Sequence, residues 1–442
     1  MDPAGSPRDD ASPAEPEWIL AGRAWLQGRL QPAEIAIGAD GRIISVGRIR
    51  TGAPRHDVGE AVILPAATDL HVHLRDPGGP AEVENIAAGT QAAALGGVTL
   101  VGDMPNNSTA ITNADLLLEK ARGVSGRAAV DVLLYASPMR ADALDRLAHT
   151  AGAFKVYLSP TTGITEVPNR KETAELLHRL AGLDLPVTVH AEDPAEFRPE
   201  VVPQTPVDWD QARPSSAESR AVERLLPAPS RLRLHVAHVT TIDVARHLRA
   251  ARVSFEVTPH HLLLSNRSGI DPRFKVNPPL RSEPERLALW EAFCRGEIPC
   301  LASDHAPHSA ESKDLPFDRA PSGMPGVETM LPLMLARVRS GELDLGTLLA
   351  AACDRPARWL GQPLGRIAPG HRANLLVVDF KARRPLSART LHAPCGWTAF
   401  EGWEAVLPRE HYRDGVQVVA EGEFVGRPAG VVVRPEFARS RP

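Results

Sequence analysis

The stretch VILPAATDLHVHLRDPG (62–78) is an apolar run that ends in two histidines and an arginine at alternate positions. Side chains of a β-strand alternate between its two faces, so residues i and i+2 share one face. His71 and His73 therefore point the same way from the end of a buried strand, and Arg75 follows just beyond it. Two imidazoles placed like this can ligate one metal ion. Taken alone, the stretch is equally compatible with chance histidines on a loop.

Further apolar runs follow along the chain, and segments of helical periodicity separate them. Together with the first run, the predicted strands are 62–73, 98–104, 129–136, 153–158, 186–191, 233–239, 253–258 and 298–304. Apolar residues recur at helical spacing between them, for example in 83–96, 113–123, 170–182, 241–251 and 283–296. Strands that alternate with helices in this way predict the α/β class, as a (β/α)8 barrel of the TIM type. Strands of such a barrel are buried on both faces, which explains their near-continuous apolar composition.

Both ends of the chain have a different texture. Residues 17–61 and 363–432 contain short β-like pieces separated by glycine turns. Because the predicted barrel (62–362) lies between them, the simplest arrangement is one small β-domain built from both chain ends. Residues 1–16 are acidic and rich in proline, and they lack the basic and apolar regions of a signal peptide. We expect them to form a disordered tail.

Composition excludes several classes of partner. The chain has 442 residues, a formal net charge of -4 and 24% charged residues, which gives no reason to expect nucleic acid or a membrane surface. No run approaches the ~18 apolar residues that span a bilayer. The four cysteines (294, 300, 353 and 395) are scattered and form no CxxC pair. We expect them to be buried free thiols in a reducing cytosol.

The other predicted strands also end in side chains that can bind a metal. His190, His238 and Asp304 each lie at the end of a predicted strand. The carboxyl ends of the strands of a (β/α)8 barrel converge on one site, so we expect these residues to join His71 and His73. They are more ligands than one closed tetrahedral site needs, and two metals that share a bridging ligand would use them better.

Lys155 is a candidate for that bridge. It lies in AFKVYLS (153–159), where alternation points it away from both Phe154 and Val156. A lysine buried in a barrel mouth beside cations would have a strongly lowered pKa. A neutral amine can add carbon dioxide to form a carbamate, an anion able to bridge two metals. The alternatives are a lysine that reaches solvent and one that pairs with Asp304.

Seven segments resemble, in the same order, the motifs of the dihydroorotases within the amidohydrolase superfamily. They are DLHVHLRDPG (69–78), MPN (104–106), VHAED (189–193), EVTPHHLLLS (256–265), KVNPPLRS (275–282), ASDHAPH (302–308) and GMPGVETMLPLML (323–335). The resemblance runs over roughly residues 60–375, and GRIAPGHRANLLVVDF (365–380) is similar to the family's return to its β-domain. The combination is far more specific than any single motif.

The resemblance implies a binuclear centre of the lysine-bridged branch of that family. The implied cofactor is a pair of zinc ions, or similar divalent metals, bridged by a carboxylated lysine and a hydroxide. The implied ligands are His71, His73, Lys155, His190, His238 and Asp304. By the same resemblance Asp304 is also the general base, which takes a proton from the attacking water and hands it to the departing ring nitrogen.

The resemblance further implies a substrate. The reaction would be the reversible hydrolysis of (S)-dihydroorotate to N-carbamoyl-L-aspartate in pyrimidine (UMP) synthesis. The implied substrate residues are Arg75, Asn106, Asn277, His308, Gly323 and Thr161. Arg75, Asn106 and His308 match the group that holds the free carboxylate, and a guanidinium forks onto such a carboxylate. Asn277 matches a ring contact, and the backbone around Gly323 matches the wall beside the ring.

Two positions depart from the family pattern. Asn106 is followed by Asn107 and Ser108, so that loop is expected to differ in shape and Asn107 could share the carboxylate. Thr161 is followed by Thr162, where an aromatic residue is usual.

Two rival functions stay open. One is another cyclic amide hydrolase, of the allantoinase or dihydropyrimidinase type, whose substrates lack the carboxylate that Arg75 would bind. The other is an inactive dihydroorotase-like subunit of aspartate transcarbamoylase, although this chain keeps every implied metal ligand. We expect a cytoplasmic enzyme. A homo-oligomer and an aspartate transcarbamoylase partner are both compatible with the sequence.

Overall fold

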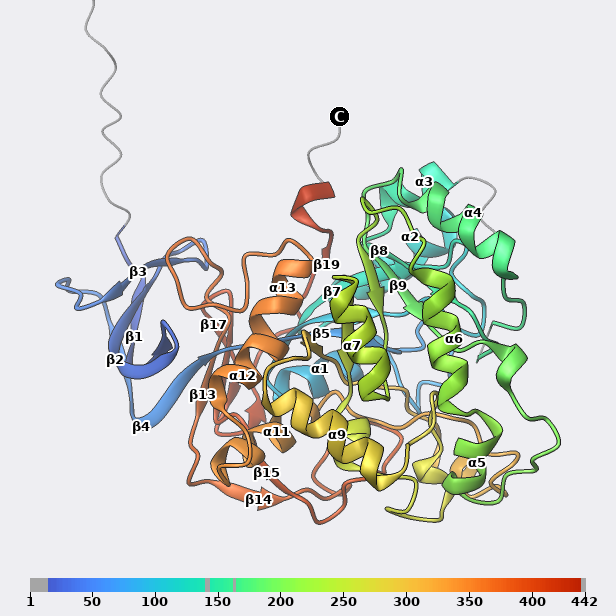
Figure 1. Cartoon of the computed structure of the whole chain (residues 1–442). Helices are drawn as coiled ribbons and strands as arrows, with labels where there is room; N and C mark the ends of the chain where they lie inside the picture. Colours follow the sequence, from blue (N-terminus) through green and yellow to red (C-terminus); the bar gives the residue numbers. More distant parts are fainter. Residues whose placement is uncertain (1–14, 140–143, 162–163, 439–442) are drawn as a thin grey trace, which may run out of the picture.

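The computed structural model describes residues 15–139, 144–161 and 164–438. Almost all of the predicted tail (1–16) and Thr162 lie outside these ranges. The described chain forms a barrel with a smaller β-sheet beside it (Figure 1).

Parallel strands form the barrel, and each pairs with the next along the chain. They are β5 (Ala67–Val72), β6 (Val98–Asp103), β7 (Asp131–Ala136), β8 (Ala153–Tyr157), β9 (Val187–His190), β10 (Leu234–Val236), β11 (Ser254–Val257) and β12 (Cys300–Leu301). The residues after β12 return to β5, where the amide of His73 donates to the carbonyl of His305 at 2.8 Å. Each predicted barrel strand contains one of these strands, so the predicted barrel is confirmed.

Helices follow each strand and cover the outside of the barrel (Figure 1). They are α1 (Ile86–Leu95), α2 (Ala114–Val124), α3 (Leu144–Thr150), α4 (Arg170–Leu180), α5 (Pro206–Ala212), α6 (Ser215–Leu225), α7 (Ile242–Ala250), α8 (Pro259–Leu263), α9 (Glu283–Cys294), α10 (Ala310–Lys313), α11 (Met330–Arg339), α12 (Leu345–Leu349) and α13 (Arg355–Trp359). Asn85, Asn113 and Asn169 cap α1, α2 and α4 by accepting from backbone amides of the first turn.

The second sheet is built from both ends of the chain, as predicted. Its strands are β1 (Trp18–Leu26), β2 (Arg29–Ile37), β3 (Ile43–Gly47), β4 (Arg55–Pro65), β13 (Leu375–Val378), β16 (Glu410–Arg413), β17 (Val416–Ala420) and β18 (Glu423–Phe424). β4 and β13 pair antiparallel, with Leu64 opposite Leu376, and this pair joins the two ends. Ile35, Ile63 and Leu375 belong to a core separate from that of the barrel. β14 (Arg383–Pro385) and β15 (Glu404–Val406) form a separate pair.

Two segments lie differently from the sequence expectation. The predicted strand 62–73 is divided, because residues up to Pro65 belong to β4 of the small sheet and β5 of the barrel begins at Ala67. Proline has no N–H to extend a ladder, which suits a change of sheet at this point. At the other end, β19 (Val432–Val433) pairs with β7 of the barrel rather than with the small sheet. The domain boundaries themselves stay a prediction.

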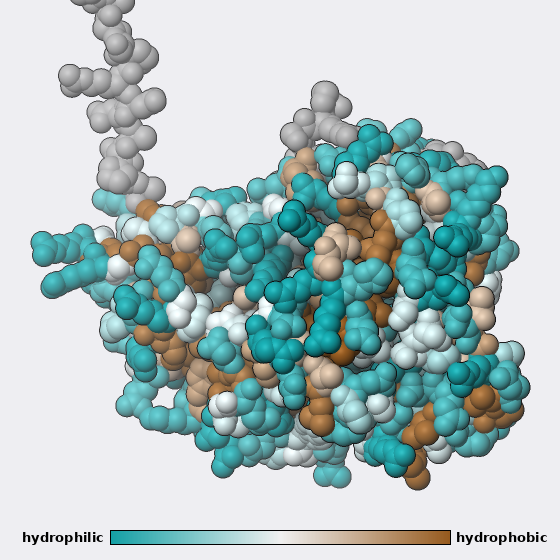
Figure 2. Space-filling view, viewed as in Figure 1, coloured by the Kyte–Doolittle hydropathy of each residue, from teal (hydrophilic) through white to brown (hydrophobic). Residues whose placement is uncertain are grey.

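Three of the four cysteines are buried as predicted, and Cys294 departs from the prediction because it is half-buried. Figure 2 shows hydrophilic side chains over most of the visible face, with apolar side chains between them. All four cysteines are free. In the described part of the chain, no helix combines the length and the apolar character needed to cross a membrane.

Candidate metal and substrate site

Polar residues that follow the barrel strands meet in one cavity. All six predicted metal ligands line it, and so do five of the six predicted substrate residues. Among the described residues, the predicted substrate residue that the lining does not include is His308. Three further residues line it that the sequence reading did not single out: Tyr157, Ala306 and Ser322. Strand ends far apart in the sequence thus build one site, as the barrel geometry requires.

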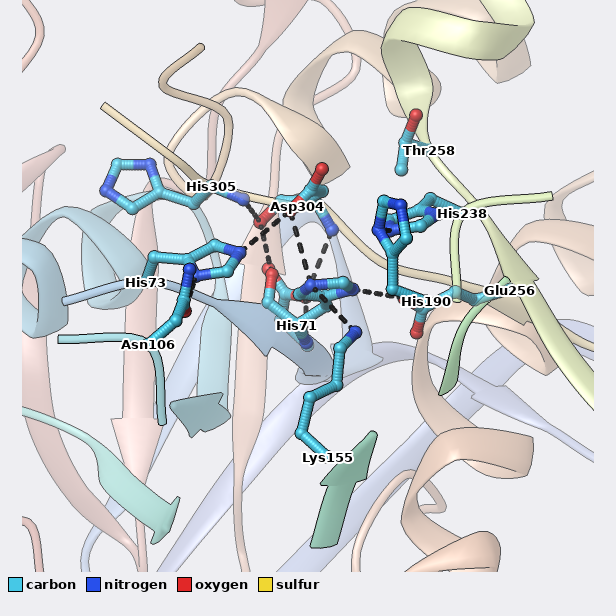
Figure 3. Close-up of polar contacts among 12 residues, drawn as sticks. His71, His73, Asn106, Lys155, His190, His238, Glu256, Thr258, Asp304 and His305 are labelled. Carbon is cyan, nitrogen blue, oxygen red and sulfur yellow. Dashed lines mark hydrogen bonds and ion pairs between the residues drawn. The ribbon is translucent and has the colours of Figure 1, made fainter. Parts of the chain in front are cut away.

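His71, His73 and Asp304 form a compact group at the centre of this cavity (Figure 3). Their ligand atoms all lie within 4.8 Å of one another, and all three residues are buried. Oδ1 of Asp304 is 3.3 Å from Nε2 of His71 and 3.1 Å from Nε2 of His73. The group therefore presents two imidazole nitrogens and one carboxylate oxygen to the same point.

The contact that Nδ1 of each imidazole makes fixes the tautomer of the ring, and so which nitrogen presents a lone pair to Asp304. Nδ1 of His71 lies 2.6 Å from Oε1 of Glu256, and Nδ1 of His73 lies 2.6 Å from Oδ1 of Asn106. Both partners are acceptors, so Nδ1 carries the proton and Nε2 presents a lone pair. Burial lowers the pKa of His71 to about 4 and that of His73 well below its usual value, so both rings are neutral at pH 7.

This donor set fits a divalent cation. Two lone pairs and the carboxylate of Asp304 point at one another, and three acceptors repel unless a positive charge lies among them. Neutral imidazole with carboxylate is a common ligand set for zinc and similar metals. His71, His73 and Asp304 thus form a divalent metal site.

Lys155, His190 and His238 lie on the other side of His71 from His73 (Figure 3). Nζ of Lys155 is 3.4 Å from Nε2 of His71, and burial lowers the pKa of this amine to about 8. Nδ1 of His190 is 3.0 Å from Nε2 of His238, while the ring centres of His71 and His238 are 5.2 Å apart. The six predicted ligands are therefore contiguous.

Two buried carboxylates support these rings, and the sequence reading gave neither a role. Glu256 lies 3.0 Å from Nε2 of His235 as well as against His71. Glu192 lies 2.8 Å from Nε2 of His190 and receives two hydrogen bonds from Arg213. A lone acidic residue within an apolar strand was the available signal, because alternation points Glu256 into the barrel. His235 thus contacts the carboxylate that orients His71.

Arg75 is the unsatisfied cation of the cavity. Its Nη1 donates a hydrogen bond of 3.4 Å to the carbonyl of Asn106. Within the described ranges no carboxylate lies at ion-pair distance from it, since the acidic residues that act on its charge, Asp304, Asp103 and Glu84, contact other side chains. Desolvation lowers the pKa of its guanidinium. A half-buried guanidinium that lines a cavity without an anion is suited to bind an anionic ligand.

The remaining predicted substrate residues lie in the lining of this cavity or next to it. Gly323 has a φ of +136°, and a Cβ there would lie 2.4 Å from the carbonyl of Ala306, so only glycine fits this wall. Asn277 Oδ1 accepts from Trp209, and Thr161 lies at the cavity edge. His308 lies behind the wall, with Nε2 2.9 Å from the carbonyl of Ser322.

Asn107 holds its loop in place. Its amide nitrogen donates to the carbonyl of Pro77 at 3.0 Å, and its oxygen accepts from the buried Lys120 at 3.0 Å. Both ends of the amide thus bind the protein itself, which fits a structural position beside Asn106.

The fold and the site define a metal-dependent hydrolase built on a TIM barrel. A model of the amidohydrolase family matches residues 62–405, which include every strand of the barrel. Curated relatives narrow this further. Dihydroorotases from Methanosarcina acetivorans and Pyrococcus furiosus are each 34% identical, over 92% and 94% of this chain and 92% and 95% of their own lengths. A dihydroorotase from Thermoplasma acidophilum is 30% identical over 94% of this chain and 97% of its own. The chain belongs to the amidohydrolase family and, within it, to the dihydroorotases.

Solved structures with the same fold carry other names. The L-hydantoinase (dihydropyrimidinase) of Arthrobacter aurescens has a TM-score of 0.85 and 25% identity, and covers 93% of this chain and 98% of its own. The dihydropyrimidinase of Brevibacillus agri has a TM-score of 0.83 at 24% identity, covering 97% of this chain and 99% of its own, which speaks for the fold alone.

Proposed function

We propose that this chain is a dihydroorotase that catalyses the reversible hydrolysis of (S)-dihydroorotate to N-carbamoyl-L-aspartate. The observation that carries the proposal is Arg75. It lies two residues after a predicted metal ligand, lines the same cavity and has no carboxylate partner in the described chain. Dihydroorotate brings a carboxylate next to a cyclic amide, so one molecule satisfies the arginine and presents the bond to be broken.

The rival ring substrates lack that carboxylate. Dihydrouracil and allantoin would leave the half-buried guanidinium of Arg75 without an anion in the cavity. The similarity of the fold to dihydropyrimidinases therefore does not carry their substrate to this chain. Because the implied metal ligands are all present and contiguous, an inactive scaffold subunit is also disfavoured.

The proposal includes a binuclear centre. His71, His73 and Asp304 would hold one divalent metal, His190 and His238 the other, and a carboxylated Lys155 would bridge them. The lowered pKa of Lys155, about 8, supports this role because the neutral amine is the form that adds carbon dioxide. Metals bound there supply Lewis acidity, which eases deprotonation of water and polarises an amide carbonyl.

The protein's own residues then divide the work. Arg75 binds the carboxylate, and the backbone at Gly323 lies along the ring. Asp304 accepts a proton from the attacking water as the new C–O bond forms. It returns the proton to the ring nitrogen as the C–N bond breaks, and the same steps run backwards in ring closure.

Purified protein assayed on dihydroorotate, dihydrouracil and allantoin tests the proposal. We expect turnover of dihydroorotate far above the other two. Arg75→Met should raise the KM for dihydroorotate at least about tenfold, since a hydrogen bond between charged groups contributes about 1.5–3 kcal/mol. Arg146→Met, at an exposed arginine on α3, is the control and should leave KM unchanged. A preference for dihydrouracil or allantoin would refute the proposal.

The same proposal also covers the metal content with the state of Lys155, the cellular compartment and the assembly of the protein. Metal analysis should find two ions per chain, zinc being the first candidate, and native mass spectrometry should find one carbon dioxide adduct on Lys155. We further propose a cytoplasmic enzyme. The mass of the purified protein in solution measures its self-association. The same measurement after mixing with an aspartate transcarbamoylase tests whether the two proteins bind.

A further inference from the structure

Tyr157 lies in the cavity, yet neither the metal ligands nor the carboxylate group includes it. It is the last residue of β8 and shares a strand face with Lys155, whose Nζ is 5.4 Å from the centre of the phenol ring. The side chain lines the cavity and is 2% exposed. It therefore occupies a position from which it can contact a bound ring.

The hydroxyl of Tyr157 is buried and has no hydrogen-bond partner among the residues that the structure describes. Buried hydroxyl groups in proteins are nearly always paired, because leaving one unpaired costs free energy. The neighbouring strand offers a contrast. Tyr135 of β7 is equally buried, and its hydroxyl lies 3.3 Å from Oγ1 of Thr188. A ligand bound in the cavity can therefore supply the missing partner of the Tyr157 hydroxyl.

Charge around the hydroxyl identifies the kind of partner. Arg75 lines the same cavity as Tyr157, and its guanidinium is the positive charge that acts on the phenol. A phenol of ordinary pKa keeps its proton at neutral pH, so the hydroxyl is available as a donor. An arginine has no acceptor, so this cavity presents two donors, and the described residues give the Tyr157 hydroxyl no hydrogen-bond partner.

We propose that the Tyr157 hydroxyl donates a hydrogen bond to the substrate carboxylate that Arg75 binds, and so helps to select rings that carry this carboxylate. This inference rests on the proposed function, since it assigns a further specificity residue to the same substrate. A carboxylate oxygen accepts more than one hydrogen bond, so it can receive the phenol together with the guanidinium fork.

Tyr157→Phe tests this by removing only the hydroxyl. The KM for dihydroorotate and the Kd for orotate, a planar analogue that keeps the carboxylate, should each rise about 10- to 100-fold. The kcat should stay within about threefold, because the bond is made equally in the ground and transition states. The Kd for uracil, which lacks the carboxylate, should not change. Tyr135→Phe is the matched control and should alter none of these values.

Stability separates this role from a structural one. Since the hydroxyl is unpaired in the protein alone, Tyr157→Phe without ligand should melt at the same temperature as the parent or higher. An unchanged Kd for orotate in a folded variant overturns the inference. An equal rise in the Kd for uracil also overturns it, and so does a loss confined to kcat. Either result would mean that the hydroxyl contacts the ring and not the carboxylate. A parent protein that neither binds orotate nor hydrolyses dihydroorotate refutes the proposed function instead.

Discussion

Arg75, His238 and Asp304 share a backbone conformation that residues other than glycine seldom adopt. Their φ values are +60°, +38° and +47°, in the left-handed region. Such a conformation costs about 1–3 kcal/mol and persists where the surrounding structure imposes it, most often at functional sites. Each of the three follows the end of a barrel strand and turns a charged or metal-binding side chain into the cavity. The strain and the chemistry thus fall on the same residues.

Asp304→Asn separates binding from turnover. Asparagine keeps the size of the side chain but cannot take the proton of the attacking water, so kcat should fall about 10²- to 10⁴-fold. The Kd for orotate should stay within a few-fold, because Arg75 and Gly323 hold the ring and its carboxylate. Steady-state kinetics with calorimetry of orotate binding measures both. Near-normal turnover would remove Asp304 from the role of general base.

At the scale of the element, the barrel strands were predictable and their supporting contacts were not. Burial on both faces leaves a continuous apolar run, and alternation tells which polar residue points inward, so Lys155 and His190 could be assigned in advance. The role of Glu256 was not predicted because its partner His71 lies 185 residues away in the sequence. That of Tyr157 was not predicted because an aromatic residue in a buried strand is typical of a core; only its unpaired hydroxyl sets it apart.

The segment that leads to Gly323 is held by two buried lysines. Lys275 donates to the carbonyls of Phe317 and Ala320 at 2.6 and 2.8 Å. Lys313 donates to the carbonyl of Pro321 at 2.9 Å. These contacts fix the wall beside the ring. Desolvation and the neighbouring charge of Lys275 lower the pKa of Lys313 to about 7, although Asp271 opposes the shift and Arg273 adds to it.

This shift predicts how stability depends on pH. Below pH 7, Lys313 is protonated in both the folded and the unfolded chain, and its contribution is constant. Between pH 7 and the unfolded value of 10.5, only the unfolded chain holds the proton, so stability rises with pH by at most about 1.4 kcal/mol per unit. Denaturant unfolding at pH 7 and 9 should show a larger gain in the parent than in Lys313→Met. Lys171→Met, at an exposed lysine of α4, should behave like the parent. An identical pH dependence in Lys313→Met would contradict the assignment.

At the scale of the whole molecule, the C-terminal part of the small sheet meets the barrel at an ion cluster around Asp131. Asp131 at the start of β7 is fully buried, with Oδ2 2.6 Å from Arg372 and Oδ1 3.0 Å from Arg413. Asp131 belongs to the barrel, and both arginines belong to the C-terminal half of the small sheet or its approach. The small sheet therefore supports the strand next to the one that carries Lys155.

Asp131→Ala tests that support. The substitution removes the buried partner of both arginines and leaves them the more exposed Asp414, so the free energy of unfolding should fall by about 3 kcal/mol, the lower end of the range for broken buried pairs. Glu60→Gln is the matched control: it removes an exposed pair with Lys381 that also joins the two chain ends, and should change stability by less than about 1 kcal/mol. Denaturant unfolding of both variants measures the difference. Because the cluster lies away from the cavity lining, the KM of the Asp131→Ala variant for dihydroorotate should stay near that of the parent under conditions where it is folded. Equal stability of the two variants would mean that the chain ends dock on the barrel through their apolar contacts alone.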